Sequence, residues 1–240
     1  MTYLGNESLA VTTLAIGDIY RKQVPTLIQS VLKFTPYDAY VITDKPEEFG
    51  NYFGPRIHFI QFDEKITDMP LRNSVGMFNY SLKLVPVEWV ANNVRPGIIC
   101  YMDCDSFWWG NCPPMLHRYF AADDGIWARF RNSLNDCEGH QIILDKLKTM
   151  GVSGSHVSTR LPIECIMLFK TGPKLPQLLD TWKKYSMLTL KTGARSDFEA
   201  VELCLAIHDT EMPHTHICQD ILSDCFRALH HGSIHAQFVI

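Results

Sequence analysis

Residues 97–110 read GIICYMDCDSFWWG, an apolar run that gives way to two acidic residues one position apart and then to three adjacent aromatic residues. The apolar run is typical of a buried strand, and Asp103 and Asp105 stand where this strand is expected to end. In an extended chain, side chains two positions apart point to the same side, so the two carboxylates are expected to converge. The stretch therefore predicts a strand end that carries an acidic pair.

Predicted strands and helices alternate along the rest of the chain. Apolar runs predict strands at 9–17, 37–44, 56–63, 125–130 and 163–170, and helical spacing predicts helices after the first strand, within 74–93 with an interruption near Pro86, at 175–186 and at 196–208. This alternation indicates an α/β fold with a mostly parallel central sheet flanked by helices. Such sheets bind ligands at the carboxyl ends of their strands, where Asp103 and Asp105 are expected.

Two further stretches are marked by proline, glycine and serine. Pro113 and Pro114 indicate the start of a helix after the aromatic residues. The region 131–160 is polar and rich in glycine and serine, and GVSGSHVST (151–159) within it is interpreted as a loop.

The composition is that of a soluble globular protein. With 240 residues, 46% of them apolar, the chain can bury a sizeable core as one large domain or as one domain with a small appendage. A net charge of -4 without a long basic run argues against nucleic acid as a partner. We expect no signal peptide and no membrane span, and therefore a cytoplasmic protein. The eight cysteines include no CxxC pair, and most are expected to be reduced core residues.

The acidic pair has two interpretations. Neighbouring carboxylates repel each other unless a cation or protons lie between them, and a hard divalent ion such as Mn²⁺ or Mg²⁺ takes carboxylate oxygens as ligands and holds the phosphates of a nucleotide. Alternatively, Asp103 and Asp105 cap the strand or form a turn with Ser106, because acidic residues are common in turns.

The aromatic run after the acids also has two interpretations. Phe107, Trp108 and Trp109 could form the edge of a cleft, because large exposed apolar patches usually mark binding sites. One or two of these rings could instead fill the core. The chain contains no GxSxG, Walker-type or GxGxxG motif, which argues against a serine hydrolase, a P-loop protein and a Rossmann oxidoreductase.

Four stretches resemble the GT-A glycosyltransferases, in particular the group of glycogenin and lipopolysaccharide galactosyltransferases (family 8). YMDCDS (101–106) is similar to the family's YLDADT, whose acids hold a divalent metal and the diphosphate of a nucleotide sugar. The resemblance implies that Asp103 and Asp105 bind the metal and act at the reaction centre. It also implies that Cys104 between them belongs to the nucleotide site.

Two stretches resemble the parts of the family that bind the donor. LAVTTLAIGDIY (9–20) looks like the opening strand and loop, which implies that four of its residues contact the nucleoside: Thr12, Thr13, Ala15 and Tyr20. YSLKLVP (80–86) looks like the segment whose basic residue reaches the donor, and Lys83 is the matching position.

The fourth stretch, ALHHGSIH (228–235), resembles the family's H-x-x-G-x-x-K-P-W tail, in which the histidine completes the metal site. Because the chain has HHG here, either His230 or His231 is the matching ligand, and the apolar residues before it favour His230. The alternative is a pH-sensitive surface pair. The K-P-W residues are missing, so the phosphate-clamping lysine has no counterpart.

Two other acids are candidates for catalysis. Glu164 stands where the family has an N-S-G strand, and it either faces the donor sugar or acceptor or forms a salt bridge at the strand end. Asp197 matches acids near the reaction centre of related enzymes, yet SDFE (196–199) is also a capping box in which an acid suits the helix dipole. The related group retains configuration, whereas an inverting enzyme would use Glu164 or Asp197 as its base.

The sequence therefore predicts a metal-dependent glycosyltransferase in which residues 1–240 form a single GT-A-like domain. It would move a sugar from a nucleoside diphosphate sugar, UDP-linked by resemblance, to an acceptor hydroxyl of a glycan, protein or small molecule, with Mn²⁺ or Mg²⁺ as cofactor. No acceptor domain is recognisable, so a partner or a second copy in a homodimer is expected to help. The alternatives are a nucleotidyltransferase, although AIGDIYRKQ (15–23) lacks its Gly-rich basic loop, and a catalytically silent nucleotide-sugar-binding module.

Overall fold

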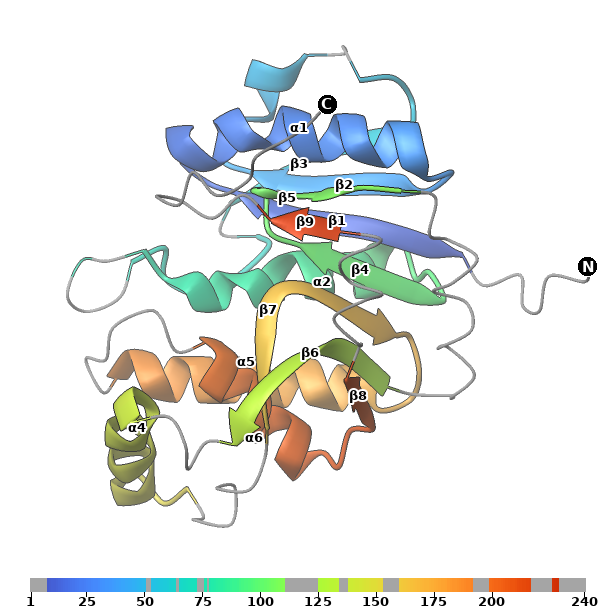
Figure 1. Ribbon diagram of the computed structural model, residues 1–240. Coiled ribbons are helices and arrows are strands. Elements are labelled where there is room, and N and C mark those ends of the chain that lie inside the picture. The colour runs from blue at the N-terminus through green and yellow to red at the C-terminus, as the bar shows by residue number, and fades with distance from the viewer. Residues whose placement is uncertain are drawn as a thin grey trace, which may run out of the picture.

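The computed structural model describes residues 8–50, 53–63, 65–72, 76, 78–110, 125–133, 138–152, 160–191, 199–216 and 226–228. Figure 1 shows these residues arranged as a central sheet with helices on both of its faces. Within these ranges, no helix combines the length and the apolar character needed to cross a membrane.

The first half of the chain supplies four strands and two α-helices. In order these elements are β1 (Leu9–Ala15), α1 (Asp18–Phe34), β2 (Asp38–Thr43), the 3-10 helix η1 (Pro46–Phe49), β3 (Ile57–Gln61), the 3-10 helix η2 (Tyr80–Lys83), α2 (Leu84–Asn93) and β4 (Ile98–Met102). The predicted strands and helices of this half are confirmed. Pro86, however, is the third residue of α2, where the proline interrupts nothing because the first turn of a helix needs no N–H donor.

The second half continues with β5 (Ser106–Trp108), β6 (Gly125–Ser133), α4 (Glu138–Thr149), β7 (Arg160–Lys170), α5 (Leu175–Lys191), α6 (Glu199–Asp209), β8 (His214–His216) and β9 (Phe226–Ala228). Helix α4 lies in the region interpreted only as polar and loop-containing. It forms because Leu144 and Leu147 are buried one turn apart on one side of the helix, while Ile142 is exposed. The helix start at Pro113 and Pro114 lies outside the described residues.

The main sheet has seven strands in the order β3-β2-β1-β4-β7-β6-β8. Strands β3, β2, β1 and β4 are parallel neighbours, as are β6 and β8, whereas β7 runs antiparallel to both β4 and β6. Strand β5 pairs with β9 in a separate two-stranded sheet. The predicted α/β class with a mostly parallel central sheet is therefore confirmed.

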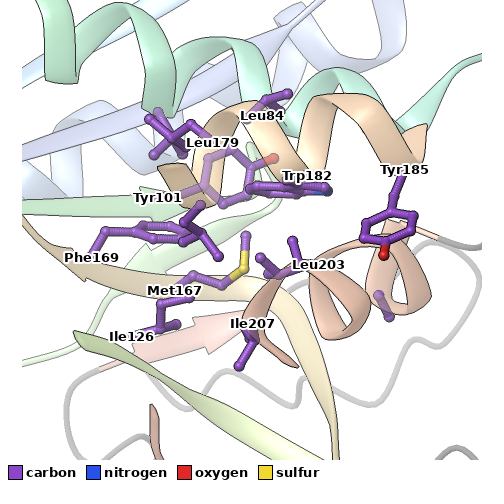
Figure 2. Close-up of a cluster of buried hydrophobic side chains, with 14 of the residues drawn as sticks. Leu84, Tyr101, Ile126, Met167, Phe169, Leu179, Trp182, Tyr185, Leu203 and Ile207 are labelled. Atoms are coloured by element: carbon purple, nitrogen blue, oxygen red, sulfur yellow. The ribbon is translucent and has the colours of Figure 1, made fainter. Parts of the chain in front are cut away.

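Two hydrophobic clusters lie on opposite faces of the main sheet. Alternate residues of β4 enter different clusters: Ile99 and Tyr101 pack with α2, α5 and α6, whereas Ile98, Cys100 and Met102 pack with α1. Because β4 is buried on both faces, its sequence is an unbroken apolar run. Figure 2 shows part of the first cluster.

The cysteines behave as the sequence predicted where they are described. Cys100, Cys104, Cys165 and Cys204 are not disulfide-bonded, and all except Cys165 are buried. Burial raises the pKa of the Cys100, Cys104 and Cys204 thiols. These three side chains are therefore protonated core residues.

Candidate active site

A cavity of about 300 Å³ lies at the carboxyl ends of the parallel neighbours β1 and β4. This is the part of an α/β sheet where ligands usually bind. Its walls come from β1, the start of α1, the segment 78–83 and the residues after β4. The lining side chains are Leu14, Tyr20, Phe78, Tyr80, Lys83, Tyr101, Asp103, Cys104 and Asp105.

The two acids reach this cavity through a turn. Strand β4 ends at Met102, and the Ser106 N–H donates to the Asp103 carbonyl at 2.8 Å, which closes a turn over residues 103–106. The backbone N–H of Asp103 donates to the Cys165 carbonyl of β7, also at 2.8 Å. The expectation of an extended chain is therefore wrong and the turn with Ser106 is confirmed, yet Asp103 and Asp105 still line the same cavity.

The Asp103 carboxylate is held by one cationic and one neutral donor. Lys83 Nζ lies 3.1 Å from Oδ2, and the Tyr101 hydroxyl donates to Oδ1 at 2.8 Å. Burial, with the nearby charge of Asp103, raises the pKa of Tyr101 well above its usual value, so Tyr101 remains a donor across the ordinary pH range. Lys83 lies on the cavity wall beside Asp103.

Cys104 lies between the two acids, but its side chain takes a different role. Its thiol donates to the Gln23 side chain of α1 at 3.2 Å and is buried. Because burial and the charges of Asp103 and Asp105 raise its pKa, the thiol is protonated. Cys104 thus ties the acidic turn to α1 and forms part of the cavity wall, and it is a poor ligand for a hard cation.

Three aromatic rings beside the acids also line the cavity. The Tyr20 and Tyr80 hydroxyl oxygens are 3.0 Å apart, and the Tyr20 ring centroid lies 5.7 Å from that of Phe78. Phe78 and Tyr80 meet edge to face at 5.3 Å. These contacts join the start of α1 to the 78–80 segment and present ring faces on which a planar base can stack.

The first turn of α1, which carries Tyr20, is fixed by a charge network around the buried Arg21. Gly17 has φ 89°, a conformation that glycine adopts without strain, and its N–H donates to the Asp44 carboxylate at 3.2 Å. Arg21 is buried and donates to Asp44 and Glu48 at 2.6–2.7 Å, and it also contacts Asp18. The first turn of α1 is therefore held against the end of β2.

Three residues predicted to contact the nucleoside do not line the cavity. Thr12 is buried on the face of β1 that carries Leu14, and its hydroxyl donates to the Tyr40 carbonyl at 3.0 Å. Ala15 packs beneath α1, and Thr13 lies on the same face of β1. Only Tyr20 of the four predicted nucleoside contacts therefore lies with the acids.

The aromatic run after the acids is divided between core and surface. Phe107 and Trp108 are buried, and the Trp108 backbone N–H donates to the Ser30 hydroxyl of α1 at 2.9 Å. Trp109 is 43% exposed and meets Phe107 edge to face. The core interpretation thus holds for two rings, and Trp109 is the ring available at the surface.

The remaining predicted residues are only partly placed. Glu164 lies in β7, but the structure does not describe its side chain, and Asp197, His230 and His231 lie outside the described residues. Within the described ranges, no group of three or more His, Cys, Asp or Glu side chains is arranged to hold a metal ion. The predicted third ligand, His230 or His231, belongs to the segment that is not described.

The described part of the site nevertheless fits a hard divalent cation. Asp103 and Asp105 present carboxylate oxygens to one cavity, and such oxygens are what Mn²⁺ and Mg²⁺ prefer. Each Asp103 oxygen that accepts a hydrogen bond keeps a second lone pair. The donor set therefore suits a divalent ion with a diphosphate better than a soft metal.

Four lining residues were missed by sequence reasoning: Leu14, Phe78, Tyr80 and Tyr101. One of them carried a usable signal. Tyr101 stands two positions before Asp103, and strand alternation places such residues on one side. Tyr80 precedes Lys83 in a short aromatic stretch, but nothing in the sequence shows that this stretch folds against Tyr20.

The sheet and cavity define the GT-A type of fold that the sequence resembled. The structure is similar to that of the galactosyltransferase LgtC, solved in complex with donor and acceptor sugar analogues, with a TM-score of 0.54. The two chains are 14% identical, and the similarity covers 82% of this chain and 70% of LgtC. No protein-family model and no curated protein sequence matches the chain.

Proposed function

We propose that the protein is a metal-dependent glycosyltransferase that uses a nucleoside diphosphate sugar, most simply a UDP-sugar. The observation that carries this proposal is that Asp103, Asp105 and Lys83 share one cavity with a group of aromatic rings at the carboxyl ends of β1 and β4. A divalent ion on the acidic pair, together with the lysine, would match the phosphates of a nucleotide, and the aromatic wall would match its base. The similarity to a galactosyltransferase fold supports the same assignment.

Each part of the cavity has a distinct role in this proposal. Tyr20 stacks on the base, and Lys83 donates to the diphosphate. Asp103 and Asp105, with His230 or His231, would hold the Mn²⁺ or Mg²⁺ ion. When bound, that ion supplies Lewis-acid stabilisation for the departing diphosphate. The roles of Thr12, Thr13 and Ala15 in the nucleoside site remain predictions, and their position suggests support of the β1 backbone.

The acceptor hydroxyl would approach the anomeric carbon of the bound sugar. Glu164 and Asp197 are the candidates for a carboxylate near the reaction centre, and exposed Trp109 is a candidate surface for the acceptor. A partner protein or a second copy of the chain would complete acceptor recognition. The cytoplasmic location and the single-domain organisation remain predictions.

The proposal is tested by the release of UDP from UDP-glucose or UDP-galactose with Mn²⁺ present. We expect Asp105→Ala to lower this rate by about 100-fold or more, as expected for loss of a group that stabilises developing charge. Asp145→Ala is the matched control, because Asp145 is an exposed acid on α4 that pairs with Lys148. Equal rates for Asp105→Ala and the wild type would contradict the proposal.

The same assay separates the two alternatives. A silent binding module would bind UDP with Mn²⁺ and release nothing from either UDP-sugar. A nucleotidyltransferase would form pyrophosphate from UTP and a sugar phosphate instead of releasing UDP.

A further inference from the structure

The Asp103 carboxylate accepts hydrogen bonds from two side chains that differ in flexibility. Lys83 donates to Oδ2 from the end of a flexible four-carbon stem, whereas Tyr101 donates to Oδ1 from a ring. In the proposed function Lys83 also serves the diphosphate. The hydrogen bond from Tyr101 to Asp103 would remain when Lys83 donates to the diphosphate instead.

The Tyr101 ring cannot easily move. It is 1% exposed and belongs to the cluster between the sheet and α2, α5 and α6. Figure 2 shows the ring beside Leu84, Leu179 and Trp182, with its hydroxyl oxygen at the far end of the ring. Close packing restricts such a side chain to one rotamer, so the position of its hydroxyl is set by the core.

From this geometry we infer that Tyr101 is a positioning residue that fixes the Asp103 carboxylate for a divalent ion. The inference rests on the proposed function of the cavity. Tyr101 would not contact the ion. Its hydroxyl holds one lone pair of Oδ1 and so orients the carboxylate, whose remaining lone pairs are available to the ion. Partners of ligating carboxylates typically contribute about 10- to 100-fold to metal affinity.

The test compares two identical substitutions. Tyr101→Phe removes the hydroxyl and keeps the ring. Tyr185→Phe is the matched control, because Tyr185 is also buried, at 2% exposed, and its hydroxyl also donates to an aspartate, Asp209, between α5 and α6. Neither Tyr185 nor Asp209 lines the cavity.

Mn²⁺ binding without nucleotide is measured from the electron paramagnetic resonance signal of free Mn²⁺. We expect Tyr101→Phe to bind Mn²⁺ about 10- to 100-fold more weakly than the wild type. Tyr185→Phe should bind Mn²⁺ as the wild type does, even if its Tm falls as far as that of Tyr101→Phe. Isothermal titration with UDP should show that saturating Mn²⁺ restores the UDP affinity of Tyr101→Phe, because the defect lies in metal binding.

Two results would overturn the inference while leaving the proposed function intact. One is equal Mn²⁺ affinity for Tyr101→Phe and the wild type. The other is a loss of UDP affinity in Tyr101→Phe that no Mn²⁺ concentration restores, which would indicate a purely structural role or a direct contact with the nucleotide. A wild-type protein that binds neither Mn²⁺ nor UDP would instead overturn the proposed function and the inference together.

Discussion

The Lys83 ammonium group lies 3.1 Å from the Asp103 carboxylate on the wall of the cavity, with the two side chains only 12% and 20% exposed. A cation on the protein thus offsets part of the negative charge that Asp103 and Asp105 bring to one place. This ion pair ties the 3-10 helix η2 to the turn after β4. Removal of Lys83 is therefore expected to change the affinities for UDP and for Mn²⁺ in different ways.

Lys83→Met should weaken UDP binding and leave Mn²⁺ binding at least as tight as in the wild type. We expect a loss of about tenfold or more for UDP, because hydrogen bonds to charged groups contribute about 1.5–3 kcal/mol. Mn²⁺ alone should gain, because the ammonium group no longer neutralises Asp103. Titration calorimetry with UDP and paramagnetic resonance with Mn²⁺ measure the two affinities. Lys174→Met is the control, because Lys174 is a half-buried lysine that is bonded to the Glu211 carbonyl away from the cavity. Parallel losses of both affinities would refute the expectation.

UDP should raise the Tm only in the presence of a divalent ion. At a hundredfold excess over its dissociation constant a ligand stabilises the folded state by about 2.7 kcal/mol, which corresponds to about 5–10 °C for a chain of this size. Differential scanning fluorimetry with UDP, with Mn²⁺, with both, and with both plus EDTA measures the effect. A full shift that survives EDTA would show that metal plays no part in nucleotide binding.

Tyr20→Ala should weaken UDP binding by about tenfold, since stacking of a base on an aromatic ring contributes about 1–3 kcal/mol. Tyr20→Phe keeps the ring and removes the hydroxyl that contacts Tyr80, so most of the affinity should remain. Ile19→Ala, at the exposed neighbouring position on α1, should bind UDP as the wild type does. If Tyr20→Phe and Tyr20→Ala lost the same affinity, the hydroxyl pair rather than the ring would be the important feature.

Glu88→Gln should stabilise the protein at pH 7–8 and have little effect at pH 4. Burial raises the pKa of Glu88 above its ordinary value of 4.5, with Asp180 and Asp68 adding to the rise and Lys183 opposing it. Because the folded state then holds the proton more tightly than the unfolded state, stability falls as the pH rises from about 4.5 through the raised pKa.

Glutamine carries no charge, so the substitution removes the cost of burying an ionised Glu88. We therefore expect a rise of about 1–2 °C in Tm at neutral pH, kept small because Glu88 is partly exposed. Thermal unfolding of Glu88→Gln and of the control Glu47→Gln between pH 4 and pH 8 measures it. A stabilisation that is larger at pH 4 than at pH 8 would have the wrong sign.

Much of the fold follows from local pattern. The unbroken apolar run before Asp103 predicted β4, because a strand buried on both faces is apolar at every position. The helical spacing before Pro36 predicted α1, because a helix buried on one face repeats its apolar residues every three or four positions. Helix α4 escaped prediction because it lies within a polar region, where Leu144 and Leu147 are the buried apolar residues among its described side chains. The antiparallel insertion of β7 between β4 and β6 has no local signature at all.

The candidate site was also predicted only in part from the sequence. The sequence predicted that Asp103 and Asp105 lie at a strand end. Its resemblance to the family also marked the basic residue Lys83. The sequence did not predict which ring of the aromatic run remains exposed, because burial of Trp108 depends on α1, which is far away in the sequence. Likewise, the aromatic wall exists because residues 78–80 fold against Tyr20.

By itself the sequence determined the alternation of strands and helices, the acidic pair at the end of β4 and the likeness to a GT-A fold, since each of these depends on residues close together in the chain. Only the tertiary structure decided that Lys83 pairs with Asp103, that Cys104 bonds to Gln23 of α1, and that aromatic rings line the same cavity as the acids. The physical reason is that such contacts join residues between 20 and 81 positions apart, and the order in which strands pack sets them rather than any local pattern.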